Sequence, residues 1–177
     1  VYKRQMNYRQ EYEKWLASPA LSEDERNELK AIANDEKEIE NRFYGPLEFG
    51  TAGLRGTMYV GLHNMNRHVI RWATQGFANV IRAEGEEAMK KGVAICMDCR
   101  NHSMEFARAA ACVMAGNGIP VRLFQALRPT PELSFAVREY GCIAGINVTA
   151  SHNPKEYNGY KVYWSDGAQL PPQHAAA

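Results

Sequence analysis

Short apolar runs alternate with helical patterns through the second half of the chain, and this alternation limits the possible folds more than any other feature. The runs over residues 93–97, 121–124 and 145–149 have the length of strands. Apolar residues at helical spacing fill residues 103–116 and 130–140 between them. Strands separated by helices of this length favour a layered α/β sheet. We therefore expect a three-layer α/β/α domain with a mixed, largely parallel sheet.

Glycine, proline and hydroxyl residues mark where the predicted helices begin and end. A first helix is predicted over residues 68–84, with its apolar residues on one face. Ser103 is expected to cap the next helix, which Gly116-Asn117-Gly118 would end. Thr130-Pro131 opens a further helix, because proline suits the first helical turn, and Gly141 closes it.

The first 44 residues predict a charged helical arm ahead of this domain. Ser18-Pro19 breaks a first helix. Ser22 and Glu25 form a capping-box pattern that starts another, and Asn34-Asp35 is a possible break within it. We expect the arm to pack and to be solvated, with no further function. One face of its first helix comprises Tyr8, Tyr12, Trp15 and Leu16.

Proline-containing segments divide the chain into three parts. Gly45-Pro46 ends the arm, and Pro171-Pro172 has the composition of an interdomain linker. We therefore expect a helical arm over residues 1–44, a domain over residues 45–172 and the start of a linker to further domains over residues 173–177. The chain does not begin with methionine, which supports the expectation that it was cut from something larger.

The composition is that of an ordinary globular domain, with 45% hydrophobic and 23% charged residues among 177. Twenty-one basic and 20 acidic residues give a net charge of +1, which provides no global attraction to nucleic acid or to a membrane surface. No apolar run approaches the roughly 20 residues that a membrane-spanning helix needs. Residues 1–6 lack the apolar stretch of a signal peptide, so we expect a cytoplasmic protein.

Cys96 and Cys99 form a C-x-x-C pattern, which occurs in metal and redox sites. Cys96 ends a predicted buried strand, however, and no second C-x-x-C follows to complete a four-ligand site. His102 is a candidate third ligand, but no fourth is evident. We favour reduced thiols in the core and in a loop over a metal or redox pair.

Polar segments follow two of the predicted strands, at the sheet edge where α/β proteins place their sites. Asp98-Cys99-Arg100 follows one strand, and residues 149–154 follow another. Ser151 lies in the second segment, in a polar turn where a ligand can approach it, although an ordinary turn is the alternative. A hydrolase using Ser151 and His152 is disfavoured, because adjacent side chains generally point apart and no G-x-S-x-G elbow is present.

The other chemistry open to Ser151 is to carry a phosphoryl group. A phosphoserine holds nearly two negative charges and needs cations nearby, for which Arg55, Arg100 and Lys161 are candidates. The glycines of Gly50-x-x-Gly53-x-x-Gly56 can bring backbone amides close to an anion, although structural turns explain such glycines more often. The pattern is neither a Walker A loop nor a dinucleotide fingerprint.

Two segments resemble active-site loops of the α-D-phosphohexomutases. Residues 149–161, with the sequence TASHNPKEYNGYK, resemble the family's active-site serine loop, and residues 49–56, FGTAGLRG, resemble its N-terminal active-site loop. The T-A-S-H-N-P segment is highly specific, and the two loops occur in the family's order. The resemblance covers residues 45–172. The arm resembles that of the longer members, the bacterial phosphoglucomutase/phosphomannomutases and the phosphopentomutase-like enzymes.

The resemblance implies that Ser151 is phosphorylated in the resting enzyme and is a Mg²⁺ ligand through its phosphate. Lys161 would be a general acid/base, with a charge clamp as the alternative, and Arg55 would hold the phosphoserine region. The reaction would be a reversible 1-to-6 or 1-to-5 phosphoryl transfer on a phosphosugar. It would proceed through a bisphosphorylated sugar, and a sugar bisphosphate would be the activator.

Four further residues gain roles from the same resemblance. His152 and Asn153 would shape the serine loop and contact the transferring group. Asp98 and Arg100 would support the site, and bind phosphate, from the neighbouring strand end. For Asp98 and Arg100, a local ion pair that only fixes the loop is an equal alternative.

The chain also departs from the family pattern. Residues 61–66 read GLHNMN where the longer relatives tend to have G-T-N-R-M-N, so we assign no role to His63 or Asn64. The family's D-G-D-x-D metal loop, G-E-E-S-G sugar loop and C-terminal phosphate-binding loop are absent. We expect an N-terminal domain that is inactive alone, with Mg²⁺ held mostly by a missing domain and with exposed interdomain surfaces able to self-associate. The alternative is a non-catalytic phosphosugar-binding fragment or regulatory relative.

Overall fold

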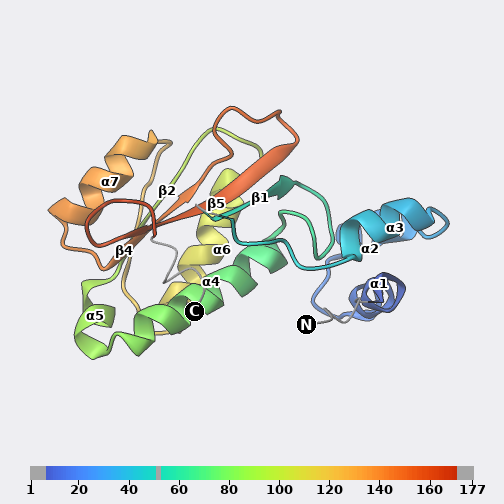
Figure 1. Ribbon diagram of the computed structural model, residues 1–177, viewed down its shortest axis with the longest axis horizontal. Helices are drawn as coiled ribbons and strands as arrows, with labels where there is room; N and C mark the ends of the chain where they lie inside the picture. The colour runs from blue at the N-terminus through green and yellow to red at the C-terminus, as the bar shows by residue number, and fades with distance from the viewer. Residues whose placement is uncertain (1–6, 51–52, 171–177) are drawn as a thin grey trace.

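Five strands form one mixed sheet at the centre of the computed structural model, which describes residues 7–50 and 53–170 (Figure 1). The order across the sheet is β1-β5-β4-β2-β3. β2 pairs in parallel with β3 and β4, whereas β5 runs antiparallel to its neighbours β4 and β1. Four strands therefore share one direction, which confirms a mixed, largely parallel sheet. The strands are β1 (Gly53–Thr57), β2 (Val93–Met97), β3 (Val121–Leu123), β4 (Ala144–Val148) and β5 (Tyr157–Trp164).

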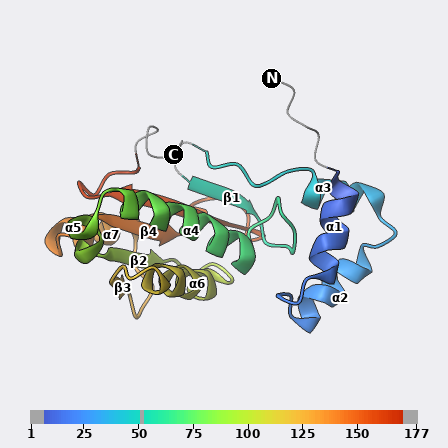
Figure 2. The ribbon, with the colours of Figure 1, turned by 90° about the horizontal axis from the view of Figure 1, so that it is seen from below.

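Helices cover both faces of this sheet (Figures 1 and 2). α4 (Arg67–Ala83) and α6 (Ser103–Gly116) pack against each other on one face, and α7 (Thr130–Glu139) packs against β2 and β4 on the other. The short α5 (Glu86–Lys91) follows α4 and adds Ala88 to the core on the α4 side. The expected three-layer α/β/α arrangement is confirmed. Within the described residues, no helix has the length and apolar character needed to cross a bilayer.

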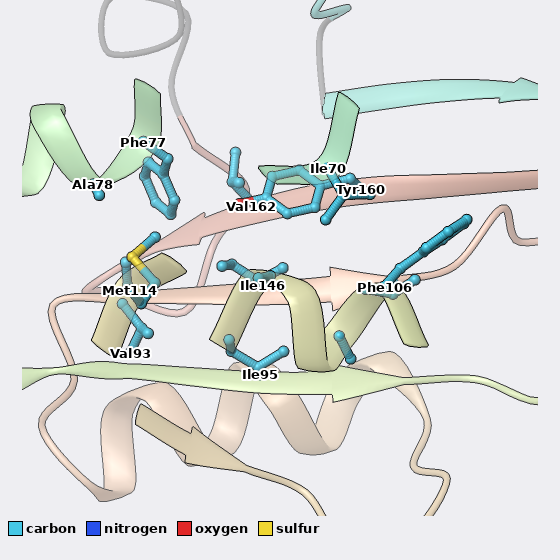
Figure 3. Packing of buried hydrophobic residues seen from close by; sticks show 14 of the residues in the cluster. Ile70, Phe77, Ala78, Val93, Ile95, Phe106, Met114, Ile146, Tyr160 and Val162 are labelled. Atoms are coloured by element: carbon cyan, nitrogen blue, oxygen red, sulfur yellow. The ribbon is translucent and has the colours of Figure 1, made fainter. Parts of the chain in front are cut away.

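Alternate strand residues feed two separate cores, one on each face of the sheet, as the pleat of a strand requires. The smaller core lies under α7, where Ala94 and Cys96 of β2 pack with Leu133 and Val137. The larger core lies between the sheet and the α4–α6 layer (Figure 3). Its strand residues include Val93, Ile95, Ile146, Tyr160 and Val162, and its helix residues include Ile70, Phe77, Phe106 and Met114.

The arm folds as three short helices that lie to one side of the sheet (Figure 2). These are α1 (Tyr8–Ala17), α2 (Glu23–Ala31) and α3 (Glu36–Phe43). Both hydrogen bonds of the predicted capping box at Ser22 and Glu25 are present, and Asp35 caps α3 at the predicted break. The arm core comprises Tyr12, Leu21, Leu29, Ile39 and Phe43, together with Val60 from the domain.

Two glutamates of α2 attach the arm to the segment between β1 and α4. Glu28 Oε1 accepts a hydrogen bond from the Val60 amide at 2.9 Å. Glu25 lies 2.6 Å from Arg67 Nη2 and 3.1 Å from His68 Nε2 at the start of α4. Burial lowers the pKa of His68 below its ordinary value, despite the opposing charge of Glu25. At neutral pH the neutral imidazole of His68 therefore donates a hydrogen bond from Nε2 to Glu25, and Glu25–Arg67 is the ion pair.

The sequence patterns do not predict β1, β5 or α5. β1 falls in the glycine-rich segment and β5 in the segment that resembles an active-site loop, and each forms through pairing with the other. The expectation that Ser103 caps α6 is wrong. The cap is His102, in a left-handed conformation with φ 61° and no side-chain cap hydrogen bond. The predicted linker, Pro171-Pro172 and residues 173–177, lies outside the described residues.

The backbones of β1 and β5 approach so closely that a side chain is excluded at Gly53. A Cβ atom placed there would lie 1.9 Å from the carbonyl oxygen of Tyr160. Gly53 also has φ +128°, a conformation that L residues rarely adopt. Pairing of β1 with β5 in this register therefore requires glycine at residue 53.

We predict that Gly53→Ala lowers the free energy of unfolding by about 2–3 kcal/mol, from backbone strain and steric overlap. Gly76→Ala is the matched control, because a Cβ at Gly76 in α4 meets nothing within 4 Å. That substitution should raise stability by about 0.5–1 kcal/mol through helix propensity. Urea denaturation followed by circular dichroism measures both. Equal stability of Gly53→Ala and the parent chain would contradict the close approach.

Candidate active site

Ser151 lies at the carboxyl end of β4, on a turn whose backbone is strained. The residue is exposed and adopts φ 56°, in the left-handed region that a non-glycine residue enters at a cost of about 1–2 kcal/mol. Its amide donates to Thr149 Oγ1 at 3.0 Å. The predicted accessibility of Ser151 is confirmed, and the surrounding hydrogen bonds hold it in a conformation that it would not adopt in isolation.

Arg100 holds the serine loop by its backbone. Nη1 donates to the carbonyl oxygens of Pro154 and Tyr157, each at 2.9 Å. Nη2 donates to those of Ser151 at 2.7 Å and Asn153 at 2.6 Å. The side chain is only 12% exposed, and Nε faces Asp98 Oδ2 at 3.6 Å. This geometry supports the loop-fixing alternative for Arg100 over direct phosphate binding, because its donors are committed to the loop.

Both carboxylate oxygens of Asp98 are also engaged. Oδ1 accepts from the Arg100 amide at 3.0 Å and from Ser103 Oγ at 2.9 Å. Oδ2 accepts from Thr149 Oγ1 at 2.5 Å. Asp98 therefore connects the segment after β2 with the segment after β4, and its hydrogen bonds order the edge of the sheet where Ser151 lies.

Lys161 and Arg55 place two positive charges on one face of the sheet. Lys161 of β5 lies opposite Asn147 of β4, and Arg55 of β1 lies opposite Gly159 of β5. Opposed and alternate residues share a face, so the two cations project to the same side. Burial and the repulsion of Arg55 lower the pKa of Lys161 below its ordinary value, and the attraction of Asp98 opposes them. No ion pair of residues 7–50 and 53–170 includes Arg55 or Lys161.

The glycine pattern before Arg55 does not present its first two amides to an anion. The Gly50 amide donates to the Gly53 carbonyl at 2.9 Å, and the Gly53 amide donates to the Gly50 carbonyl at 3.4 Å. These two glycines bond to each other at the start of β1, in agreement with the structural alternative. Thr51 and Ala52, between them, lie outside the described residues.

His152 and Asn153 flank Ser151 in different ways. His152 Nδ1 lies 3.4 Å from Ser151 Oγ, so the expectation that their side chains point apart is wrong. The left-handed backbone of Ser151 brings them together. Within the described part of the chain, no carboxylate pairs with His152 to orient it as the base of a hydrolase. Asn153 Oδ1 is buried and has no hydrogen-bond partner among the described residues, which leaves an acceptor available in the loop.

The two cysteines of the C-x-x-C pattern have different environments. Cys96 is buried and its Sγ donates to Asn147 Oδ1 at 3.2 Å, whereas Cys99 is exposed. Burial raises the pKa of Cys96 to about 12, so its thiol stays protonated at neutral pH. A protonated, buried thiol is a poor metal ligand and a poor redox nucleophile, which agrees with core and loop thiols.

Magnesium does not fit these residues by themselves. The described residues contain no group of three or more His, Cys, Asp or Glu side chains that could hold a metal ion. Asp98 is the carboxylate that contacts the serine loop, and both of its oxygens are already engaged. Mg²⁺ prefers several oxygen ligands in octahedral order. A magnesium site at Ser151 would need ligands from outside this part of the chain.

The arm contributes a wall beside the site. A hollow of about 420 Å³ lies between α3 and the domain. Arg55 and Tyr157 line it from the sheet, and Glu38 and Arg42 line it from α3. The expectation that the arm only packs and is solvated omits this wall. No sequence pattern predicts this wall, because α3 and the sheet residues that line the hollow come together only in the folded chain.

Sequence reasoning also omits three polar residues that complete the site. Thr149 links Asp98 to the Ser151 amide, and Ser103 binds Asp98 from α6. Asn158 Nδ2 donates to Ser103 Oγ at 3.0 Å and to the Asn101 carbonyl at 2.9 Å. A usable signal exists, since Thr149 and Asn158 lie within the segment over residues 149–161 and Ser103 lies five residues after Asp98.

Comparison with known proteins gives a consistent result. Residues 46–177 match the family described as phosphoglucomutase/phosphomannomutase, alpha/beta/alpha domain I. Phosphopentomutase of Homo sapiens is 43% identical over 152 residues, which are 82% of this chain and 25% of that protein. Phosphoglucomutase of Staphylococcus aureus strain USA300 is 44% identical over 144 residues, which are 80% of this chain and 26% of that protein.

A solved structure agrees with these matches. A Thermus thermophilus protein assigned as a phosphomannomutase superposes with a TM-score of 0.67 and 31% identity, over 75% of this chain and 29% of that one. The chain thus spans about a quarter of the length of the curated relatives it matches. The family match over residues 46–177, the relatives and the shared fold lead to one conclusion: the chain belongs to the phosphoglucomutase/phosphomannomutase family and carries its domain I.

Proposed function

We propose that this chain is the phosphoserine-bearing domain of a phosphosugar mutase, with Ser151 as the residue that carries the phosphoryl group. The family match and the relatives' names support the reaction class. Because the chain spans about a quarter of those relatives, the activity belongs to a longer protein. Hexose and pentose phosphates are both compatible substrates, since the relatives include phosphoglucomutases and phosphopentomutases.

The observation that carries this proposal is the setting of Ser151. Its hydroxyl is exposed on a left-handed turn, and the turn's backbone is tied down by Arg100 and Thr149. Arg55 and Lys161 lie on the adjoining sheet face without ion-pair partners in the described residues. A fixed, accessible hydroxyl, together with two cations that form no ion pair with a described residue, suits a phosphoserine, whose charge is close to −2 at neutral pH.

The transfer balances without a co-reactant. The bond between phosphorus and Ser151 Oγ breaks as a bond forms between phosphorus and a free hydroxyl oxygen of the sugar phosphate. The hydroxyl proton passes to a base, and Ser151 Oγ regains a proton. The bisphosphorylated sugar then turns, and its other phosphoryl group returns to Ser151. Positioning and charge neutralisation supply most of the rate in such reactions.

Lys161 is the proposed proton carrier. Burial and Arg55 lower its pKa, which raises the fraction of neutral amine available to accept a proton at neutral pH. Arg55 would hold the phosphoserine, and His152 and Asn153 would contact the transferring group. For Arg100 we propose the positioning of the loop, which its four bonds to backbone carbonyls support.

The remaining parts of the proposal concern the complete protein. Magnesium would neutralise phosphoryl charge, with the Ser151 phosphate as its ligand from this chain and the other ligands from outside it. A sugar bisphosphate would supply the first phosphoryl group to Ser151. We place the protein in the cytoplasm. Exposed aromatic residues such as Trp72 on α4 and Phe135 on α7 support self-association of the separate domain.

Ser151 should carry phosphate in the longer protein. Intact mass and peptide mapping after incubation with a sugar bisphosphate should place one phosphoryl group on Ser151. Ser151→Ala should lose both the phosphate and turnover. Ser165→Ala is the matched control, because Ser165 is also exposed and follows β5 at its far end. A fully active Ser151→Ala enzyme would exclude the mechanism.

Lys161→Met should lower turnover in the longer protein by about a hundredfold or more if Lys161 moves the proton. Lys155→Met, which removes an exposed lysine from the same loop, should leave turnover nearly unchanged. Arg55→Met removes a charge that lowers the Lys161 pKa, so that pKa should rise in an NMR titration of the unphosphorylated 177-residue chain. A Lys161→Met effect confined to substrate affinity would favour a charge clamp instead.

The 177-residue chain alone should fold without catalysing. Its two cores and its paired sheet are complete in the described residues, so its thermal melt should be cooperative. Without ligands for Mg²⁺ and groups to hold the distal phosphate, turnover should fall by at least about a thousandfold. A coupled mutase assay with Mg²⁺ and a sugar bisphosphate measures this. Turnover equal to that of the longer protein would refute the proposal.

If the longer protein binds phosphosugars but shows no turnover, the non-catalytic alternative holds.

A further inference from the structure

A line of hydrogen bonds runs from the start of α6 to the backbone amide of Ser151. Ser103 Oγ lies 2.9 Å from Asp98 Oδ1. Asp98 Oδ2 lies 2.5 Å from Thr149 Oγ1, which in turn lies 3.0 Å from the Ser151 nitrogen. Ser103 therefore reaches the phosphoryl-carrying residue through two intermediaries, without touching it.

Each bond in this line has only one possible direction. The Ser151 amide can only donate, so Thr149 Oγ1 accepts there. The ionised carboxylate of Asp98 can only accept, so the single hydroxyl proton of Thr149 points to Asp98. The single proton of Ser103 likewise points to Asp98 Oδ1, because its oxygen already accepts from the Asn158 amide group. Because every direction is fixed, each side chain in the line has one hydrogen-bonding orientation.

The far end of the line is fixed by the sheet. Asn158 Oδ1 accepts from the Gly159 amide at 2.8 Å, and its Nδ2 donates to the Asn101 carbonyl at 2.9 Å as well as to Ser103. These partners set the orientation of the side-chain amide. Asn158 lies opposite Gly56 in the β1–β5 ladder, so the backbone of the sheet fixes the position at which the line of hydrogen bonds begins.

Burial makes these bonds hard to replace with water. Ser103 is 1% exposed, Asn158 is fully buried and Thr149 is 6% exposed. Removal of the Ser103 hydroxyl would leave one donor of the buried Asn158 side chain without a partner, and Asp98 Oδ1 would keep only the Arg100 amide. Asp98 would lose the bond that holds it from the α6 side, and Thr149 would lose a fixed acceptor.

We propose that Ser103 is a positioning residue for phosphoryl transfer at Ser151, acting through Asp98 and Thr149. Its hydroxyl sets the carboxylate of Asp98, the carboxylate sets the Thr149 hydroxyl, and that hydroxyl holds the amide of Ser151 in its left-handed conformation. The catalytic part of this inference rests on the proposed function. The structural part, control of the Ser151 amide, stands independently of it.

Ser103→Ala should make the Ser151 amide exchange with solvent at least about tenfold faster, measured by NMR on the 177-residue chain. Exchange at β2 and β4 amides should remain within about twofold. Ser134→Ala is the matched control, since Ser134 is also a helical serine that donates one hydrogen bond, to the Gly167 carbonyl at 2.7 Å. Should Ser103→Ala not fold, Ser103→Cys keeps the volume with a weak donor and should change exchange in the same direction.

A double-substitution cycle tests whether the line acts as one unit. Thr149→Val removes the next hydroxyl, so adding Ser103→Ala to it should cause little further change at the Ser151 amide. Multiplying effects, or an unchanged Ser151 amide in Ser103→Ala, would overturn the proposal.

Activity gives a separate reading of the same variants. In the longer protein, Ser103→Ala should lower kcat by about tenfold to a hundredfold with KM within about twofold, as expected for a residue that orients another. An unchanged kcat with a faster Ser151 amide would overturn the catalytic part alone. Absence of turnover and of Ser151 phosphate in the unsubstituted protein would count against the proposed function, while the exchange result would still decide the positioning role.

Discussion

Pairing of β5 with β1 on one side and β4 on the other joins three segments that lie far apart in the chain. Because successive strand residues point to opposite faces, a slip of one residue would exchange every side chain of β5 between faces. Lys161 would enter the larger core, and Tyr160, which is fully buried there, would face the site. The register that closes the core therefore also sets the position of the lysine.

The same ladder anchors the start of the serine loop, which is exposed but heavily hydrogen-bonded. Thr149 donates its amide to the Gly159 carbonyl, so the loop leaves β4 directly from a sheet hydrogen bond. Arg100 then binds four carbonyls along the loop, and charge-assisted bonds of this kind are stronger than neutral ones. A loop held in this way can keep Ser151 in its left-handed conformation before any substrate arrives, which lowers the cost of reaching a reactive geometry.

The sequence predicts part of this arrangement well and part of it poorly. Two strands and three helices lie within one or two residues of their predicted bounds, namely β2, β4, α4, α6 and α7. They are predicted well because the spacing of apolar residues, and the glycine, proline and hydroxyl residues at the ends of helices, are local signals. The same signals miss β1 and β5, because the glycines of β1 and the polar start of β5 give no local strand pattern, and both strands form through pairing with distant segments.

The candidate site shows the same division. Motif spacing predicts Arg55, Lys161 and Asp98 as members of the site, and the sheet places Arg55 and Asp98 close enough to Lys161 to shift its pKa in opposite directions. It does not predict where donors point, so the commitment of Arg100 to backbone carbonyls and of Ser103 to Asp98 appears only in three dimensions. The chemical roles of these residues remain predictions.

The two outer strands have a consequence for how this domain behaves among its own copies. A sheet edge offers unpaired backbone groups to which another chain can add a strand. β1 spans five residues with Arg55 exposed at its centre, and β3 spans three residues with Arg122 exposed at its centre. Short edges that carry a charge are poor templates for strand addition. The exposed arginines at both edges therefore disfavour strand addition by a second copy of this chain.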